Sequence, residues 1–128
     1  LSPYYPPHAL SALVATWLPL NQAWMVYVLT MVSHYWLASV SVYILANSMG
    51  AAPLVAGFAS LTLSSLGYSM KQNSCIVYTC AWIPILILAS SHHSVMLLGI
   101  SLGMMLLAGY WPIAIYAIPL GCLCWLLA

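Results

Sequence analysis

The sequence predicts an all-α, polytopic integral membrane protein, and three observations support this fold class. The chain of 128 residues carries one basic residue, Lys71, and no aspartate or glutamate. Apolar residues make up 66% of it, and the mean hydropathy is +1.09. The apolar runs are continuous rather than alternating, as in membrane helices. Because a soluble domain carries about a quarter charged residues, the surface of this chain must face mostly lipid or other membrane proteins.

The N-terminal segment is rich in proline and leads into a short apolar helix. Residues 1–7 contain three prolines, which predicts an extended lead-in with Pro7 in the first turn of a helix. Residues 8–20 are apolar up to Pro19, which ends the helix. At about 1.5 Å per residue this helix reaches roughly 20 Å, which is too short for a core of ~30 Å. We therefore expect an interfacial or re-entrant helix.

Two longer membrane helices follow. Residues 21–48 form the longest stretch without glycine or proline, and Gly50 is a candidate for a left-handed helix cap. Residues 51–70 begin with Pro53 in the first turn and are rich in small residues, which let helix backbones approach closely in lipid. Residues 71–74 are the most polar run and predict an aqueous loop.

Three shorter apolar helices complete the prediction, at residues 75–90, 95–108 and 113–128. Pro84 interrupts the first and Pro119 bends the last, while turns at residues 91–94 and 109–112 separate them. The sequence thus predicts about five transmembrane helices and one interfacial helix. They form a single transmembrane helical domain over residues 1–128, which we expect to be a segment of a larger membrane protein.

The composition restricts the chemistry that the chain can perform. Without carboxylates there is no acidic general acid or base and no hard-cation site of charged oxygens. An enzyme made of these residues alone would depend on His, Cys, Tyr and Lys. The spacing of the four cysteines does not match zinc knuckles, so they are expected to pack within helices: Cys75, Cys80, Cys122 and Cys124.

His34 lies in the middle of the longest predicted helix, where a histidine needs a polar partner. Its neutral imidazole could ligate a haem iron or a chlorophyll magnesium. A second histidine at a fitting depth is not expected, because His8, His92 and His93 fall at predicted helix ends. Structural hydrogen bonding by His34 is the favoured interpretation, and the cofactor ligand remains the alternative.

Five short motifs follow one another along nearly the whole chain. They are residues 5–8 (Tyr-Pro-Pro-His), 34–38 (His-Tyr-Trp-Leu-Ala), 65–68 (Ser-Leu-Gly-Tyr), 81–85 (Ala-Trp-Ile-Pro-Ile) and 107–112 (Leu-Ala-Gly-Tyr-Trp-Pro). In this order they resemble the YfhO-like bacterial membrane proteins of the GT-C superfamily of polyprenyl-phosphate-sugar-dependent glycosyltransferases. The chain departs from that family at Asn47 and Ser48, where the family has a basic residue, and at Tyr110, where it has histidine.

The resemblance implies a multi-pass protein of the bacterial inner (cytoplasmic) membrane that transfers a sugar from a polyprenyl-phosphate donor on the extracytoplasmic side. It implies membrane lipids and a lipid-linked sugar as partners. The residues expected to line the substrate groove are His8, Tyr68, Lys71 and Asn73. The family's catalytic carboxylate lies upstream of the first motif, so no catalytic residue is assigned in this chain and its status as an enzyme stays open.

The resemblance also implies an orientation in the membrane. Residues 5–8, 68–74 and 109–111 would lie on the extracytoplasmic side, whereas residues 47–50 and 92–93 would be cytoplasmic. This places Lys71 outside, against the tendency of basic residues to stay in the cytoplasm.

The competing hypothesis is a non-catalytic structural subunit of a larger respiratory or photosynthetic membrane complex. Its partners would be other membrane subunits, and haem or chlorophyll would be bound through His34 if a cofactor is present. No cofactor is expected under the first hypothesis, and no nucleic acid under either.

Overall fold

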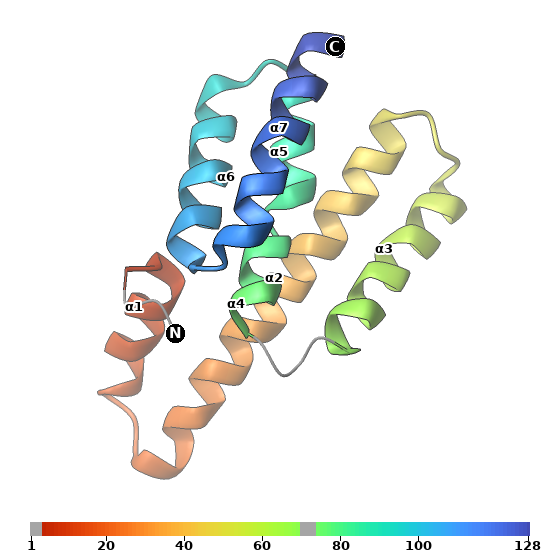
Figure 1. Ribbon diagram of the computed structural model, residues 1–128. Helices are drawn as coiled ribbons and strands as arrows, with labels where there is room; N and C mark the ends of the chain where they lie inside the picture. Colours follow the sequence, from red (N-terminus) through yellow and green to blue (C-terminus); the bar gives the residue numbers. More distant parts are fainter. Residues whose placement is uncertain (1–3, 70–73) are drawn as a thin grey trace.

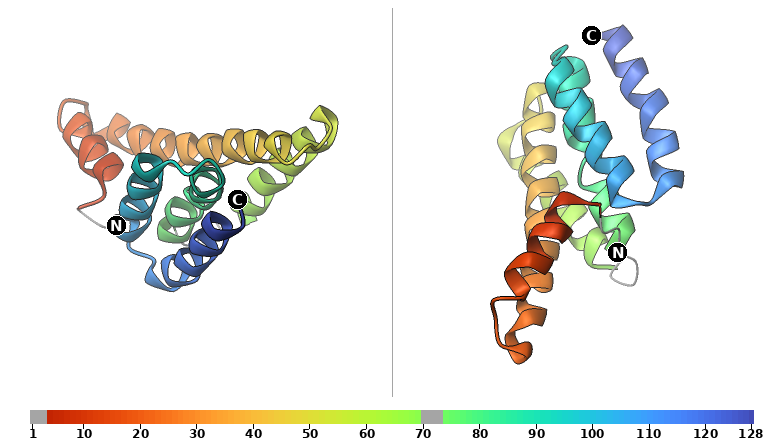
Figure 2. Two further views of the ribbon diagram at one scale, coloured as in Figure 1. Left: turned by 90° about the horizontal axis from the view of Figure 1, so that it is seen from above. Right: turned by 90° about the vertical axis from the view of Figure 1, so that its left-hand side faces the viewer.

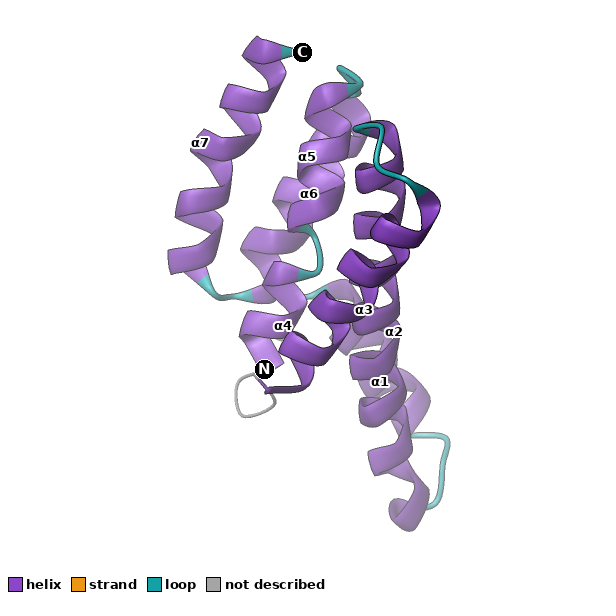
Figure 3. Cartoon of the chain, turned by 90° about the vertical axis from the view of Figure 1, so that its right-hand side faces the viewer, coloured by secondary structure: helices purple, strands orange, loops and turns teal. Residues whose placement is uncertain are grey.

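The computed structural model describes residues 4–69 and 74–128, and within these ranges the chain contains helices and turns but no strand (Figure 3). The helices are α1 (Pro6–Ala15), α2 (Leu20–Ser48), α3 (Pro53–Ser69), α4 (Ser74–Cys80), α5 (Ile83–Ser91), α6 (Val95–Ala108) and α7 (Trp111–Leu127). The predicted all-α class is confirmed. Side chains are described for residues 4–63 and 76–128.

α2 is the element against which most of the others pack. Its 29 residues correspond to a length of about 43 Å. α3 folds back along its C-terminal half, and α1 folds back along its N-terminal half (Figure 1). α5 lies between α2 on one side and α6 and α7 on the other (Figure 2). The hairpin of α1 and the first half of α2 projects beyond the rest of the bundle (Figure 3).

The short N-terminal helix differs in its bounds from the expected residues 8–20. α1 begins at Pro6 and ends at Ala15. It begins earlier because consecutive prolines fit the first turn, where the missing N–H is not needed and φ is already helical. It ends earlier because Pro19 disfavours helical geometry at the residue before it. Pro19 is instead the extended N-cap residue of α2.

The end of α2 is formed as the sequence predicts. Gly50 has φ +84°, and its N–H donates to the carbonyl of Asn47 at 3.0 Å. The N–H of Ala51 donates to the carbonyl of Ala46, also at 3.0 Å. These two bonds satisfy the last carbonyls of the helix in the arrangement that a left-handed glycine permits. The predicted bounds of this helix, residues 21–48, agree with the structure to one residue.

The expected helix over residues 75–90 is divided into α4 and α5 by a turn at Ala81 and Trp82. The sequence placed the interruption at Pro84, but Pro84 lies in the first turn of α5. A proline ring inside a helix clashes with the carbonyl four residues earlier, which here belongs to Cys80, the last residue of α4. The interruption therefore precedes the proline and places Trp82 in a turn.

The remaining two helices are close to their predicted bounds. α6 matches residues 95–108, and Gly109 with φ +87° makes the turn that follows. α7 begins at Trp111 rather than at residue 113, because Pro112 fits its first turn. Pro119 lies inside α7, which continues to Leu127.

Among the described residues, α2 is the one helix that is both long and apolar enough to cross a membrane alone. Its most apolar window is only 17% buried, which is unlike the core helix of a soluble protein. The other apolar helical segments are shorter, namely Pro53–Leu63 within α3, Ile76–Ser91 across α4 and α5, and the helices α6 and α7.

The interior of the bundle is made largely of small side chains. Alanines are buried at positions 38, 56, 81, 89, 108, 114 and 117. Large apolar side chains point outward from every one of the longer helices, for example Leu20, Leu54, Val95 and Tyr116. One buried cluster joins α5, α6 and α7 through Leu86 and Met105. A second joins the N-terminus to α4 and α6 through Tyr5, Tyr78 and Ala108.

Candidate functional site

The aromatic and imidazole side chains that could carry chemistry meet where α1, α2 and α4 approach one another. Tyr5 precedes α1 and His8 lies in its first turn, His34 lies in the middle of α2, Tyr78 belongs to α4, and Trp82 lies in the turn after it. We call these five residues the ring cluster. Tyr5 and Tyr78 are fully buried, and His8 and His34 are 8% and 4% exposed. Four of the five side chains are thus shielded from solvent, whereas Trp82 is half-buried.

A directed chain of hydrogen bonds runs through the ring cluster. Nε1 of Trp82 donates to the hydroxyl of Tyr5 at 2.9 Å, and that hydroxyl lies 2.5 Å from Nε2 of His34. Nδ1 of His34 lies 2.6 Å from the carbonyl oxygen of Thr30. A carbonyl can only accept, so Nδ1 carries the proton and Nε2 of a neutral imidazole accepts from Tyr5. Each of these atoms then has a partner of the correct kind.

The Tyr78 ring fills the space between the two histidines. Its centroid lies 4.4 Å from that of His8 at an interplanar angle of 78°, and 4.5 Å from that of His34 at 71°. Tyr5 lies further away, at 5.6 Å. Edge-to-face contacts of this kind are favourable because the positive edge of one ring meets the negative face of another. The four rings thus form one packed unit.

Burial changes the acid–base behaviour of Tyr5. Loss of solvation raises the pKa of its hydroxyl to about 12, although the hydrogen bond from Trp82 lowers the pKa in part. The phenol consequently stays protonated at neutral pH. This agrees with its role as the donor to His34.

Two hydroxyl groups extend the polar contacts toward the tip of the hairpin. Oγ of Ser11 donates to the carbonyl of Pro7 at 2.6 Å, and Oγ1 of Thr30 donates to the carbonyl of Val26 at 2.8 Å. The two hydroxyls also contact each other across α1 and α2, and there one of them donates to the other in place of the carbonyl in its own helix. They attach α1 to α2 about one turn away from His34.

Of the four residues expected to line a substrate groove, His8 is the one whose surroundings are described. It belongs to the ring cluster and also lines a cavity of about 170 Å³ between α1 and α2, together with Ser11 and Tyr27. Lys71 and Asn73 lie outside the described residues, as does the side chain of Tyr68. The predicted groove is therefore not brought together by any described contact.

The arrangement at His34 favours hydrogen bonding over cofactor ligation. An axial ligand needs a free imidazole lone pair, but Nε2 accepts from Tyr5 and Nδ1 donates to Thr30. As arranged, His34 does not fit an axial ligand. The parts of the chain that the structure describes contain no group of three or more His, Cys, Asp or Glu residues able to hold a metal ion.

Sequence reasoning found part of this cluster and missed the rest. It identified His34 and its need for a polar partner, but it expected His8 at a helix end, away from His34. The structure places both histidine rings against Tyr78. Tyr78 was not identified, and its only signal was an aromatic residue in a short apolar run. The sequence indicates Tyr5 and Trp82 only as members of the motifs at residues 5–8 and 81–85.

Three of the five sequence motifs, those at residues 5–8, 34–38 and 81–85, contribute to the ring cluster. These three motifs therefore meet in space, where α1, α2 and the α4–α5 turn pack together. The resemblance to the YfhO-like proteins stays a prediction. Compared with protein-family models, curated proteins and solved structures, the chain matches none of them.

Proposed function

We propose that the chain is a multi-pass membrane protein in which α2, α3, the α4–α5 pair, α6 and α7 cross the bilayer. The distribution of side chains supports this topology, since small residues lie inside and large apolar residues lie outside. An exposed apolar surface of this extent is suited to lipid or to other membrane helices rather than to water. The bacterial inner membrane is the location that the sequence resemblance implies.

Helix lengths support the same topology. α3 and α7 have 17 residues each, which corresponds to about 26 Å. α4 and α5 together run from Ser74 to Ser91, a similar distance. These lengths are close to the ~30 Å of a hydrocarbon core. α6 has 14 residues, about 21 Å, and crosses where the bilayer is locally thinner.

Within this topology we propose a structural role, as a non-catalytic unit of a larger membrane assembly. The exposed apolar side chains of the longer helices support the assembly, since they offer surfaces to other subunits, and the hydrogen-bond chain from Trp82 through Tyr5 to His34 supports the structural role. These polar groups serve as partners for one another across three segments. Such a cluster fixes the relative positions of these segments. In lipid its hydrogen bonds are not exchanged for bonds to water, because no water is present to replace a lost partner.

The assembly is tested by purifying the tagged chain from its native membranes in a mild detergent. Native mass spectrometry should then give a defined complex heavier than the 13.9 kDa chain, with the same stoichiometry in independent preparations. A chain that remains a monomer at all detergent concentrations would contradict the structural role. Retention in the membrane pellet after carbonate extraction checks the topology separately.

Glycosyl transfer is the second candidate function, and the order of the five motifs supports it. His8 lines a cavity, as a groove residue should, but the volume of about 170 Å³ is below the roughly 300–1,000 Å³ of most small-molecule sites. The catalytic carboxylate would have to come from elsewhere. A transfer assay with a polyprenyl-phosphate-linked radioactive sugar tests this: transfer that is lost in His8→Ala supports it, and transfer equal to blank membranes overturns it.

A further inference from the structure

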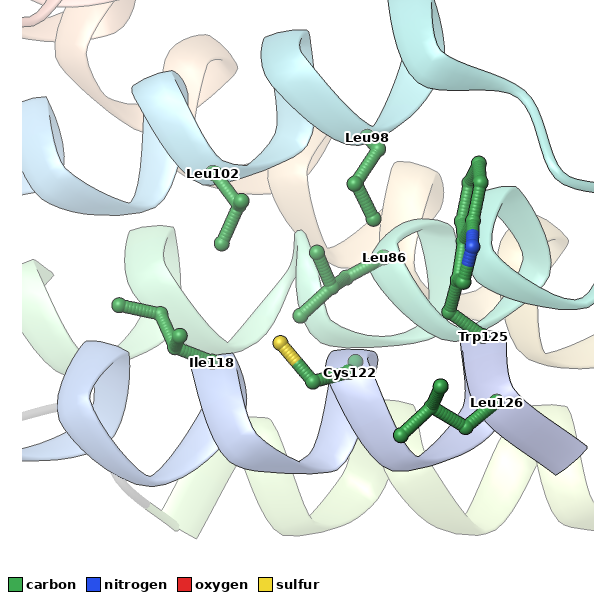
Figure 4. A pocket seen from close by; sticks show the side chains of 8 residues that line it. Leu86, Leu98, Leu102, Ile118, Cys122, Trp125 and Leu126 are labelled. Atoms are coloured by element: carbon green, nitrogen blue, oxygen red, sulfur yellow. The ribbon is translucent and has the colours of Figure 1, made fainter.

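A second cavity, separate from the ring cluster, lies between α5, α6 and α7 and has a volume of about 440 Å³. Figure 4 shows side chains from α6 and α7 pointing toward Leu86 of α5. The lining residues are Leu86, Leu98, Leu102, Ile118, Gly121, Cys122, Trp125 and Leu126. Leu86 is fully buried and forms the floor, whereas Ile118 and Leu126 are exposed at the rim. The cavity therefore opens to the outer surface of the bundle.

The chemistry of the lining selects an apolar occupant. Apart from the thiol of Cys122 and the indole N–H of Trp125, the lining side chains carry no polar group. A polar ligand would lose its hydrogen bonds to water here and gain almost none in return. At Gly121 the floor is tight, since a Cβ there would lie 3.2 Å from the Leu86 side chain.

The volume of the cavity favours a thin chain over a protein helix. One turn of helix with a diameter of about 10 Å and a pitch of 5.4 Å occupies roughly 420 Å³. The cavity of about 440 Å³ would hold only one such turn, whereas a packed helical partner presents several. A hydrocarbon chain lying along α7 fits the same space over a greater length.

One end of the cavity carries polar groups. The Trp125 ring lines it, and the ring of His93 packs edge-on against Trp125 with a centroid distance of 4.8 Å and an angle of 85°. His93 is exposed in the turn between α5 and α6, where φ is +51°. Imidazole and indole N–H groups donate hydrogen bonds, so this end offers donors to an anionic headgroup.

We propose that this cavity binds one acyl chain of a membrane phospholipid, with the lipid phosphate beside His93 and Trp125. The inference rests on the proposed multi-pass topology, in which the α5–α6 turn lies at the bilayer surface and the middle of α7 lies in the hydrocarbon. The acyl chain then runs from Trp125 toward Leu102 and Ile118, parallel to the helices. This is the direction that a bilayer lipid already takes.

Photocrosslinking in nanodiscs of phosphatidylglycerol tests the proposal, with a diazirine in the acyl chain and labelled peptides mapped by mass spectrometry. We expect the peptides around Leu102 and Ile118 to be labelled at least five-fold more than the peptide around Phe58, which is an outward residue of α3. Equal labelling of these surfaces would overturn the proposal, because it would show only general contact with lipid.

Matched variants on α7 test whether the labelling lipid lies in the cavity. Cys122→Trp fills it, and Leu123→Trp adds the same side chain at the adjacent, exposed position. The first should reduce labelling at least five-fold and the second should not change it. Leu102→Phe is a milder filling variant if Cys122→Trp loses its helical circular dichroism. Labelling that survives in both filling variants would contradict the assignment.

Two further experiments test the phosphate contact and the membrane topology separately. His93→Ala should reduce labelling by the phospholipid at least three-fold but not labelling by a diacylglycerol with the same diazirine chain. An equal effect on both lipids would remove the phosphate contact. If the wild-type chain is not retained in the membrane by carbonate extraction, the topology fails. If it is retained but the cavity is not labelled, only the lipid site fails.

Discussion

Tyr5 joins three segments through a single hydroxyl group. It accepts from Trp82 of the α4–α5 turn and donates to His34 of α2, while its own backbone leads into α1. Removal of that oxygen leaves a half-buried indole N–H and a buried imidazole nitrogen without their partner. A buried polar group that loses its partner costs about 1–3 kcal/mol.

Tyr5→Phe should therefore lower the free energy of unfolding in detergent by about 1–3 kcal/mol. Tyr4→Phe is the matched control, because Tyr4 is 78% exposed and should change stability little. Chemical unfolding followed by circular dichroism measures both. Equal stability of the two variants would show that the hydrogen-bond chain contributes nothing.

Alkaline pH offers a second test of Tyr5. Its pKa is raised from 10.0 to about 12 in the folded protein, so the folded protein binds the phenolic proton more tightly than the unfolded chain does. The resulting stabilisation is complete below pH 10 and is lost as the pH rises toward 12. We expect the difference in Tm between wild type and Tyr5→Phe to shrink between pH 9 and pH 11.5. A difference that stays constant would contradict the burial of Tyr5.

His34 gives a spectroscopic prediction. Because its Nε2 is used by Tyr5, the absorption spectrum of the purified protein should be the same in wild type and His34→Ala. A Soret or chlorophyll band that disappears in His34→Ala would instead establish the cofactor-binding subunit. His93→Ala is the control for loss of an exposed imidazole.

At the scale of elements, the sequence predicted which segments are helical but not where each proline lies within its helix. Continuous apolar runs separated by Gly50 and Gly109 made the helices evident. The sequence predicts an interruption at Pro84 and a turn at Pro112, yet both prolines occupy the first turn of a helix. The local sequence around a proline in the first turn of a helix resembles that around a proline that interrupts a helix. Tertiary packing decides which of the two forms.

The ring cluster could be predicted even less well. Tyr5 and His34 are 29 residues apart, and Tyr5 and Trp82 are 77 apart. Their contact depends on how α1 folds back on α2 and on where α4 ends. Neither periodicity nor composition contains that information, whereas the need of a mid-helix histidine for a partner is local and was predicted.

The turn between α4 and α5 gives the prediction at this scale. Pro84→Ala removes the clash with the carbonyl of Cys80, so α4 and α5 should join and turn Trp82 away from Tyr5. A double-mutant cycle measures this: Tyr5→Phe should cost at least 0.5 kcal/mol less in the Pro84→Ala background. Additive effects would mean that the turn does not position Trp82. Pro119→Ala, in the interior of α7, is the control and should leave the cost of Tyr5→Phe unchanged.

At the scale of the whole molecule, the helix ends gather at two ends of the bundle. Ser48, Ser91, His92 and Ala128 line one cavity and so lie at one end. Tyr5 and Ala108 lie together toward the other. The sequence predicts that residues 5–8 and 109–111 share one side of the membrane and that residues 47–50 and 92–93 share the opposite one, and these sides stay a prediction.

Cysteine labelling tests this grouping in a background without the four native cysteines. His92→Cys should react with an impermeant maleimide only after the membrane is opened. Tyr110→Cys should react in intact cells, as should Lys71→Cys, whose side follows from the predicted topology alone. Labelling of all three from the same side would contradict a multi-pass bundle, and a complete exchange of sides would invert the orientation.

The projection of the α1–α2 hairpin has a consequence for the surrounding bilayer. α2 spans about 43 Å and α6, with 14 residues, about 21 Å. One flank of the protein is thus longer than a hydrocarbon core of ~30 Å and the other is shorter. In the proposed multi-pass topology, the hydrophobic mismatch therefore has opposite signs on the two flanks: tilting or a thicker bilayer accommodates α2, and a thinner bilayer accommodates α6. In that topology the protein would thin the membrane locally beside α6 and favour neighbours of matching thickness at each flank.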